Sequence, residues 1–266
     1  MAASGGRERG LHARGIPAKQ RAHLAAVLIA LALLLSPPAH AQSEDDIAFD
    51  PTITDAQFAE FSRLVAQGIY ATPVDPARAR GLLGFDIGVA ATAVPVDPNA
   101  PYYQQSTTND FTIKDYVAVP RLIVSKGLSV ATVSAMYAKV PDSDIRVLGG
   151  ALDVPLISGG LLKPTLAVRG AYSQLQGVEN FELKTYGVEV FLSKGFGPVT
   201  PYAGVGRSRS DARGTVPAPL ARTLRDQADQ NRITVGVKLS LLLPKIVVEA
   251  TQAEVRSYAA KISFGL

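Results

Sequence analysis

The sequence has no cysteine and no tryptophan, and its three histidines, His12, His23 and His40, all lie within the first 41 residues. Without cysteine, disulfides, redox thiols and a lipid-modified N-terminal cysteine are excluded. If residues 1–41 are removed as a leader, the mature chain also lacks the histidine that Ser-His and Cys-His catalysis and most zinc and haem sites require. We therefore expect no enzymatic activity, catalytic residue, metal site or cofactor. Carboxylate-only and Ser-Lys chemistry remains formally open.

An excess of either charge is also missing from the mature chain. The full sequence has 27 basic and 23 acidic residues, but five basic residues and one acidic residue belong to residues 1–41, which leaves 22 of each. Nucleic-acid binding needs a basic surface. We therefore expect no nucleic-acid partner.

Residues 1–41 have the three parts of a secretory signal peptide. A basic stretch ends at Arg21, the apolar run 24–35 follows, and Ala39-His40-Ala41 places small residues before a cleavage site. The apolar run has twelve residues, fewer than the roughly 20 that span a bilayer, which argues against an uncleaved membrane helix. We expect cleavage before Gln42 and export.

The first mature segment, 42–80, is predicted to contain one short amphipathic helix over residues 55–68. Thr54 or Asp55 suits its N-cap and Gly68 its end. Its apolar side chains recur at helical spacing: Phe58, Phe61, Leu64 and Val65. We expect this segment to rest in the periplasm, because side chains fill the lumen of a small barrel. The alternative is that the helix enters the lumen as a plug, and removal of residues 42–80 should then raise conductance.

Residues 81–266 lack any apolar run long enough for a membrane helix but show a repeated strand pattern. Segments of about ten residues with alternating character, separated by turn-forming residues, are typical of membrane barrels. We predict an all-β fold, an up-and-down antiparallel transmembrane β-barrel of about ten strands, within a range of 8 to 12. The predicted strands are 83–94, 115–125, 128–140, 145–156, 162–173, 182–194, 199–208, 231–242, 245–252 and 256–266. An exported soluble barrel or sandwich is the alternative.

The alternation is clearest in three of these segments. Within 231–242, one face carries the apolar residues Ile233, Val235, Val237, Leu239 and Leu241. The opposite face carries Arg232, Thr234, Gly236, Lys238 and Ser240. Segments 182–194 and 256–266 follow the same period of two, which is the period of a strand with one apolar face.

Connection lengths test the barrel independently. The two long connections, 95–114 and 209–230, both follow odd-numbered segments, whereas connections after even-numbered segments are short. Outer-membrane barrels have long extracellular loops and short periplasmic turns. We therefore expect the long loops outside and the C-terminus in the periplasm.

The loop 209–230 is rich in arginine and aspartate. We interpret it as solvated and mobile, so that deletion of residues 212–226 should leave assembly intact. Alternatively, its arginines contact lipopolysaccharide phosphates or an external partner. Three of its residues would share one side of a short helix: Leu220, Leu224 and Ala228.

Aromatic residues cluster near the predicted strand ends, as the interfacial girdles of a membrane barrel require. The tyrosines expected at the extracellular ends are Tyr116, Tyr137, Tyr172 and Tyr258. The aromatic residues expected at the periplasmic ends are Phe85, Phe196, Tyr202 and Phe264.

The last residues resemble the C-terminal assembly signal of bacterial outer-membrane barrels. Alternating apolar residues with an aromatic near the end carry the resemblance: Tyr258, Ile262, Phe264 and Leu266. The chain departs from the usual pattern by ending in leucine rather than phenylalanine or tryptophan. The resemblance implies recognition by the barrel-assembly machinery.

Further motifs are spread over residues 81–266. They are Gly84-Phe-Asp-Ile-Gly88, Val119-Pro-Arg-Leu122, Lys126-Gly127, Tyr186-Gly-Val-Glu189, Ser193-Lys-Gly-Phe196 and Pro201-Tyr-Ala-Gly-Val-Gly206. Together they resemble an uncharacterised family of Gram-negative outer-membrane β-barrel proteins, similar to the small OmpA-type barrels. The resemblance implies a barrel fold and an outer-membrane location, and no activity.

Six charged residues on the polar faces are the candidate lumen charges: Arg121, Arg169, Glu189, Lys238, Glu249 and Lys261. Because buried charges need partners or water, we expect a paired network that fills or narrows the lumen. The favoured function is a small structural or binding barrel in the outer membrane. The alternative is a narrow channel for ions or small solutes, with Arg121, Arg169 and Lys238 near its constriction. Expected partners are outer-membrane lipid, lipopolysaccharide and the barrel-assembly machinery.

Overall fold

The computed structural model describes residues 47–266 except 107–114, 140–143, 161–162, 219–220 and 242–243. All of the described residues belong to one compact unit, residues 38–266. The predicted signal peptide, residues 1–41, lies outside the described part of the chain. No helix among the described residues is long and apolar enough to cross a membrane.

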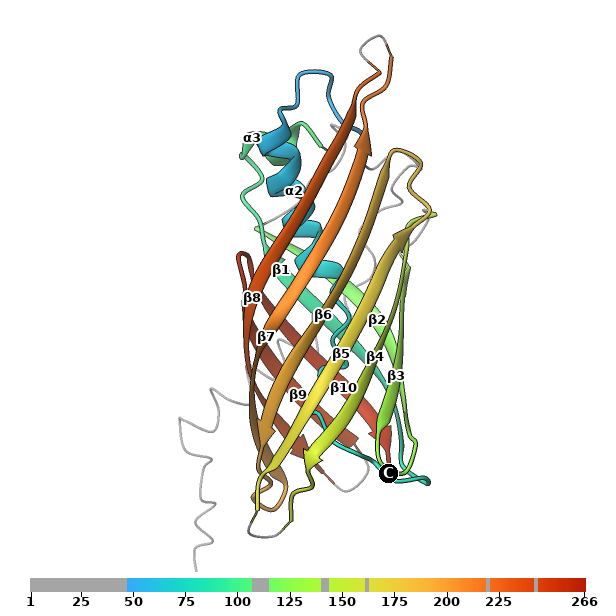
Figure 1. Ribbon diagram of the computed structural model, residues 1–266, viewed down its shortest axis with the longest axis vertical. Helices are drawn as coiled ribbons and strands as arrows, with labels where there is room; N and C mark the ends of the chain where they lie inside the picture. Colours follow the sequence, from blue (N-terminus) through green and yellow to red (C-terminus); the bar gives the residue numbers. More distant parts are fainter. Residues whose placement is uncertain (1–46, 107–114, 140–143, 161–162, 219–220, 242–243) are drawn as a thin grey trace, which may run out of the picture. The chain divides into compact units, whose positions relative to one another are not determined.

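Ten antiparallel strands form a closed barrel, in which each strand pairs with its neighbours in sequence and β1 pairs with β10 (Figure 1). The strands are β1 (Phe85–Pro95), β2 (Tyr116–Gly127), β3 (Thr132–Lys139), β4 (Arg146–Ile157), β5 (Thr165–Gln176), β6 (Phe181–Ser193), β7 (Val199–Thr215), β8 (Thr223–Ser240), β9 (Pro244–Gln252) and β10 (Arg256–Gly265). The predicted fold class and the strand number are confirmed. Because the barrel is closed, the sheet has no unpaired edge strand where all ten strands run side by side.

Side chains alternate between the outside and the inside of the wall. In β8, Val235 and Val237 are 52% and 42% exposed, whereas Thr234 between its apolar neighbours is 2% exposed. The same alternation runs through β6 and β10. Apolar side chains on the outside and polar ones on the inside reverse the arrangement of a water-soluble barrel.

The segment 209–230 is not a loop, because β7 and β8 continue through it as a paired ribbon up to Thr215 and Thr223. Its apolar residues Ala212, Leu224 and Ala228 face inward at a period of two. Our prediction of a solvated loop and the alternative of a short helix are therefore wrong. Most of the charged residues that misled the prediction occupy the outer face of this ribbon, whereas Asp226 faces inward and is paired with Arg63 of the N-terminal segment. Leu220 lies outside the described residues.

Helix α2 (Asp55–Ile69) begins and ends close to the predicted boundaries. Thr54 and Gln57 form a capping box, in which each side chain accepts a hydrogen bond from the other's backbone N–H group. Short helix α3 (Pro101–Gln104), in the β1–β2 connection, packs against the same end of the barrel as α2 (Figure 1).

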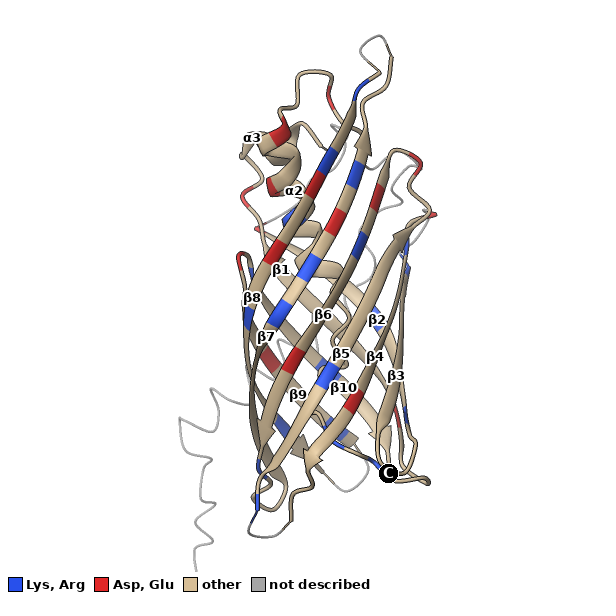
Figure 2. Cartoon of the chain, in the orientation of Figure 1, with Lys and Arg blue, Asp and Glu red and all other residues tan. Residues whose placement is uncertain are grey.

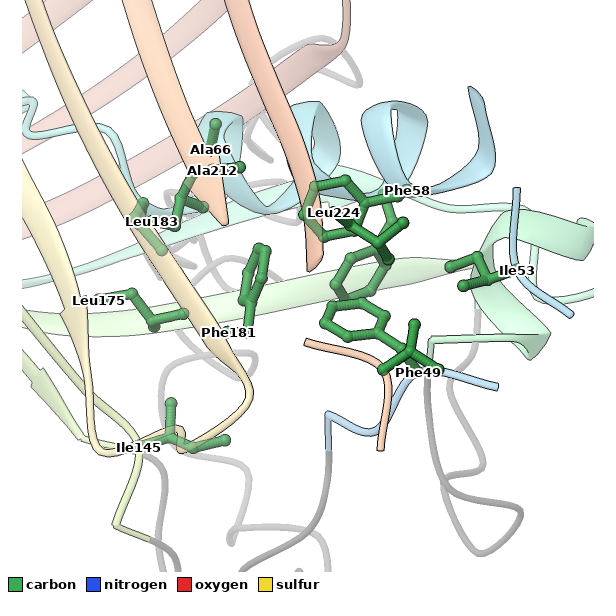
Figure 3. Packing of buried hydrophobic residues seen from close by; sticks show 13 residues of the cluster. Phe49, Ile53, Phe58, Ala66, Ile145, Leu175, Phe181, Leu183, Ala212 and Leu224 are labelled. Atoms are coloured by element: carbon green, nitrogen blue, oxygen red, sulfur yellow. The ribbon is translucent and has the colours of Figure 1, made fainter. Parts of the chain in front are cut away.

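An aromatic cluster fixes α2 inside the upper end of the barrel (Figure 3). Phe58 of the helix is fully buried, and its ring lies 6.0 Å from that of Phe181 on β6. The ring of Phe49 lies 5.2 Å from Phe58 and 5.6 Å from Phe181, in edge-to-face contacts. Leu224 of β8 belongs to the same cluster. The helix thus fills the space that the β6, β7 and β8 walls enclose.

The chain after α2 runs on through the lumen to the start of β1. Tyr70, Ala71, Val74 and Ala77 are each at most 2% exposed and pack on inward-facing wall residues. The expectation that segment 42–80 rests in the periplasm is therefore wrong for its described residues, and the lumen alternative is correct. We expected wall side chains to fill the lumen, but many inward residues are small, including Gly149, Ala167, Ser173 and Gly187.

We predict that Gly214→Ala destabilises the barrel by about 1–3 kcal/mol, because the added methyl overpacks the aromatic cluster. A Cβ atom at Gly214 would lie 2.5 Å from the Phe58 ring and 2.9 Å from the Phe49 ring. Gly170→Ala is the matched control, since a Cβ atom there meets nothing within 4 Å. Urea unfolding in detergent measures both changes, and equal unfolding midpoints would contradict the packing described here.

Candidate functional site: the closed lumen

The structure places all six candidate lumen charges inside the barrel. Each has a relative exposure of 6% or less, and they project from different strands around the wall. The network that these six residues form includes other residues as well. Five of the six bind the segment 67–80, which passes through the middle of the lumen, and Lys261 pairs with Asp86 of β1.

Arg121 of β2 holds the C-terminal end of α2. Its Nη1 donates to the backbone carbonyl of Tyr70 at 2.9 Å, and its Nη2 donates to that of Gly68 at 2.5 Å. The last carbonyls of a helix lack intrahelical partners and carry partial negative charge. A wall arginine therefore satisfies the end of the helix at the point where the chain becomes extended.

Arg232 of β8 is a second wall cation at this level, and it was not among our candidates. Its Nη1 donates to Oε1 of Gln67 at 2.8 Å, and its guanidinium carbon lies 3.7 Å from the ring centroid of Tyr70. The Tyr70 hydroxyl donates to Oε2 of Glu189 at 3.3 Å. The sequence had placed Arg232 on the polar face of its strand, so alternation alone could have identified it.

Arg169 of β5 lies at the middle of the lumen and is completely buried. It forms a two-point ion pair with Asp153 of β4, with nitrogen–oxygen distances of 2.7 and 2.9 Å. Its Nη2 also donates to the backbone carbonyl of Asp75 at 2.9 Å, and its guanidinium carbon lies 4.7 Å from the Phe191 ring centroid. The bidentate geometry offsets part of the cost of burying both charges.

Two carboxylates organise the lower lumen. Asp75, on the threaded segment, accepts from Nζ of Lys238 at 2.7 Å and pairs with Arg80. Asp86 of β1 pairs with Lys245 and Lys261, both at 3.2 Å, and with Arg80 at 3.6 Å. We missed both carboxylates. Asp75 lies in a stretch that resembles a linker, and Asp86 lies in a segment where small residues occur on both faces.

Glu249 of β9 receives two hydroxyl groups. Tyr202 donates to its Oε2 at 2.8 Å, and Thr72 of the threaded segment donates to its Oε1 at 3.1 Å. Tyr202 is 4% exposed and points into the lumen. Its assignment to the periplasmic girdle is therefore wrong, because it follows the inward parity of β7 rather than the preference of tyrosine for strand ends.

Little space remains around this network. A cavity of about 10 Å³, the size of one water molecule, lies beside Gln67 and Tyr70. A cavity of about 210 Å³ lies at the mouth near Pro76, Arg78 and Lys163. Between them, Val74, Arg169 and Lys261 have no surface accessible to water. In the described part of the chain, the lumen is therefore closed at its middle.

Above this level, Arg63 joins α2 to two hairpins. Its guanidinium lies 2.5 Å from Glu254, in the β9–β10 turn, and 3.5 Å from Asp226 of β8. Burial lowers the pKa of Arg63, but the two carboxylates raise it by more than burial lowers it. The pKa is therefore above its ordinary value, and the guanidinium remains charged. The helix is thus fastened to the wall at its middle as well as at its C-terminal end.

The outer surface has an apolar belt bounded by aromatic residues. One rim consists of outward tyrosines that are 40–55% exposed: Tyr116, Tyr137, Tyr172, Tyr186 and Tyr258. The other rim includes Phe85, Phe196 and Phe264. Between the rims, the outward-facing residues of the described strands are uncharged except at the edges, where Lys126 pairs with Phe85 and Arg207 pairs with Val188. Further charges lie on the β7–β8 ribbon above the belt (Figure 2).

The boundary of the belt is sharp on the β7–β8 ribbon. Val205 pairs with Ile233 on the outer face, and the next outward pair along the ribbon is Arg207 with Asn231. The residues that resemble an assembly signal also lie in the belt, since Tyr258, Phe264 and Leu266 are exposed on its surface. Their role in assembly stays a prediction.

No protein-family model matches the sequence. No curated protein matches it. A comparison with solved structures finds similarity to several outer-membrane proteins. The N-terminal β-barrel domain of Pseudomonas aeruginosa OprF is 9% identical, with a TM-score of 0.36, and the match covers 70% of this chain and 99% of that one. Neisserial surface protein A is 11% identical, with a TM-score of 0.30 and coverages of 68% and 96%. Ail, the attachment invasion locus protein of Yersinia pestis, is 11% identical, with a TM-score of 0.31 and coverages of 68% and 95%.

We predict that Asp75→Asn destabilises the protein by about 3 kcal/mol, because it leaves Lys238 buried without its carboxylate. The double variant Asp75→Asn/Lys238→Met should recover part of this loss, since it removes the orphaned charge. Asp229→Asn is the control, because its pair with Arg209 is exposed and long, at 3.9 Å. Urea unfolding midpoints in detergent provide the test, and no recovery in the double variant would count against the buried pair.

Proposed function

We propose that the protein is an integral outer-membrane β-barrel whose own N-terminal segment closes its lumen. It would act as a structural or binding barrel, and its contacts with other molecules would be made by the end that projects beyond the belt. The observation that carries this proposal is the uncharged outer belt with an aromatic rim at each end. Water would be a poor solvent for such a surface, whereas lipid would cover it.

The height of the belt supports a membrane location. Strand β1 has eleven residues, and all of its outward-facing residues are uncharged. At about 3.3 Å per residue and a tilt of about 40°, such a strand rises about 25 Å, the height of the apolar band in outer-membrane barrels. Strands of this length therefore suit the hydrocarbon layer of that membrane.

Connection lengths support the orientation. The long β1–β2 connection, α2 and the β7–β8 ribbon lie at one end, and short turns such as residues 128–131 lie at the other, with the C-terminus (Figure 1). With long loops outside, the ribbon end would be extracellular. The outward-facing side chains of β10, among them Tyr258 and Phe264, would face the barrel-assembly machinery during biogenesis.

Lipopolysaccharide is the partner that the outer face of the ribbon suits best. Arg213 lies directly opposite Arg225 in the β7–β8 register, and like charges at such positions are unfavourable. A phosphate between them would reverse this effect, because arginine binds phosphate through two parallel hydrogen bonds. Arg207 lies six residues nearer the belt on the same strand as Arg213, about 20 Å away, and would meet phosphates at the edge of the membrane.

We predict that Arg213→Gln/Arg225→Gln loses much of the thermal stabilisation that added lipopolysaccharide produces, while stability in detergent alone stays the same or rises slightly. Lys163→Gln, which removes a positive charge at the opposite end of the barrel, is the control. Melting temperature with and without lipopolysaccharide is the measurement. Equal stabilisation of the double variant and the control would exclude a phosphate site at this pair.

We also predict that the full mature chain is silent in planar bilayers, whereas a variant without residues 42–80 conducts. The reason is that the segment removed fills the lumen between β2, β5, β8 and β9. Faster gel migration before boiling than after boiling verifies folding of both proteins. Conductance of the full chain would instead support the narrow channel, and a folded but silent deletion variant would show that the wall alone closes the lumen.

A further inference from the structure

We propose that residues 47–80 cross the membrane inside the barrel, so that the N-terminal end of this segment lies on the cell-surface side, opposite the C-terminus. This inference rests on the membrane location and orientation of the proposed function. An even-stranded barrel by itself returns the chain to the side where its first strand began. The threaded segment adds one crossing, which turns the barrel into an anchor for its own N-terminal end.

One end of the segment is held among the long connections. The Asp50 N–H group donates to the carbonyl of Gln105, in the β1–β2 connection, at 2.9 Å. Arg222, beyond the tip of the β7–β8 ribbon, donates to the carbonyl of Ile53. Phe49 packs on Phe181 at the start of β6. All of these contacts belong to the end of the barrel that carries α2 and α3 (Figure 1).

The other end of the segment is held at the β2–β3 turn. The hydroxyl group of Thr132 donates to the carbonyl of Arg78 at 2.8 Å and accepts from the N–H group of Arg80 at 3.1 Å. Gly127 donates to the carbonyl of Gly84 at 2.9 Å. The C-terminal residue lies at the same end, because the N–H group of Leu266 donates to the carbonyl of Phe85. The two ends of the described chain are therefore at opposite mouths.

Between these ends, the segment touches the wall on several sides. Arg121 holds residues 68–70, Glu249 accepts from Thr72, and Arg169 and Lys238 hold Asp75. The eleven steps from Ile69 to Arg80 can span about 36 Å when extended, and the fifteen residues of α2 add about 22 Å. This length exceeds the belt of about 25 Å.

A cysteine cross-link tests the threading directly, and the absence of native cysteine keeps the background clean. A Cβ atom at Gly149 of β4 would lie 3.0 Å from the Cβ atom of Ala71, near the roughly 3.5–4.5 Å of a disulfide. We expect Ala71→Cys/Gly149→Cys to form an intramolecular disulfide in isolated membranes, seen as a band shift that reductant abolishes. Ala71→Cys/Gly170→Cys is the matched control, since Gly170 lies on the outer face of the neighbouring strand and should not cross-link.

Labelling of single cysteines then tests the side of the membrane. The sites are Ala56→Cys on the first turn of α2, Ala218→Cys at the tip of the β7–β8 ribbon and Val130→Cys in the β2–β3 turn, all exposed positions. With a membrane-impermeant maleimide on intact cells, we expect Ala56→Cys and Ala218→Cys to label equally. We expect Val130→Cys to label only after the outer membrane is permeabilised.

The outcomes separate this inference from the proposed function. Labelling of Ala218→Cys but not of Ala56→Cys, without the cross-link, would overturn the threading and leave the membrane barrel intact. Labelling of Val130→Cys alone in intact cells would reverse the orientation and overturn the placement of the segment's N-terminal end on the cell-surface side. A soluble protein whose gel migration does not change on boiling would overturn the proposed function itself.

Discussion

An extended chain inside a closed barrel has no strand partner, so its backbone polar groups depend on donors and acceptors from the wall. Arg121, Arg169 and Thr132 meet this need by donating to carbonyls of the threaded segment at its top, middle and bottom. Each of these donors is an inward residue of a different strand. The wall donors must face the carbonyls of the threaded segment, and the rest of the interior is arranged around this constraint.

Room for the segment and charge balance are two further parts of the same arrangement. Small inward residues such as Gly149 and Gly187 bring the segment within contact distance, and a Cβ atom at Gly187 would lie only 2.5 Å from the hydroxyl oxygen of Tyr70. The lower wall contributes Lys238, Lys245 and Lys261, which would repel one another without the carboxylates of Asp75 and Asp86. The segment therefore supplies the carboxylate that pairs with Lys238, and the wall supplies the donors that the segment's carbonyls need.

The outward-facing residues of these same strands meet a different requirement from the inward-facing ones. Residues of one parity form the apolar belt, while residues of the other parity face the lumen and its threaded segment. Above the belt, the β7–β8 ribbon keeps its inner apolar row, because Ala212 and Leu224 still pack on α2. Its outer row becomes charged at Arg207. The change from apolar to charged residues thus affects only the outer face of this ribbon.

The sequence by itself determined the barrel, its ten strands, the short helix and the inward parity of Arg121, Arg169 and Lys238, because a period of two and capping signals are local properties of the chain. It did not determine where residues 47–80 lie, nor that 209–230 is a ribbon. Those outcomes depend on inward side-chain volumes summed over several strands, and on ion pairs such as Lys238 with Asp75, which lie 163 positions apart in the chain. Only the closed tertiary structure brings those residues together.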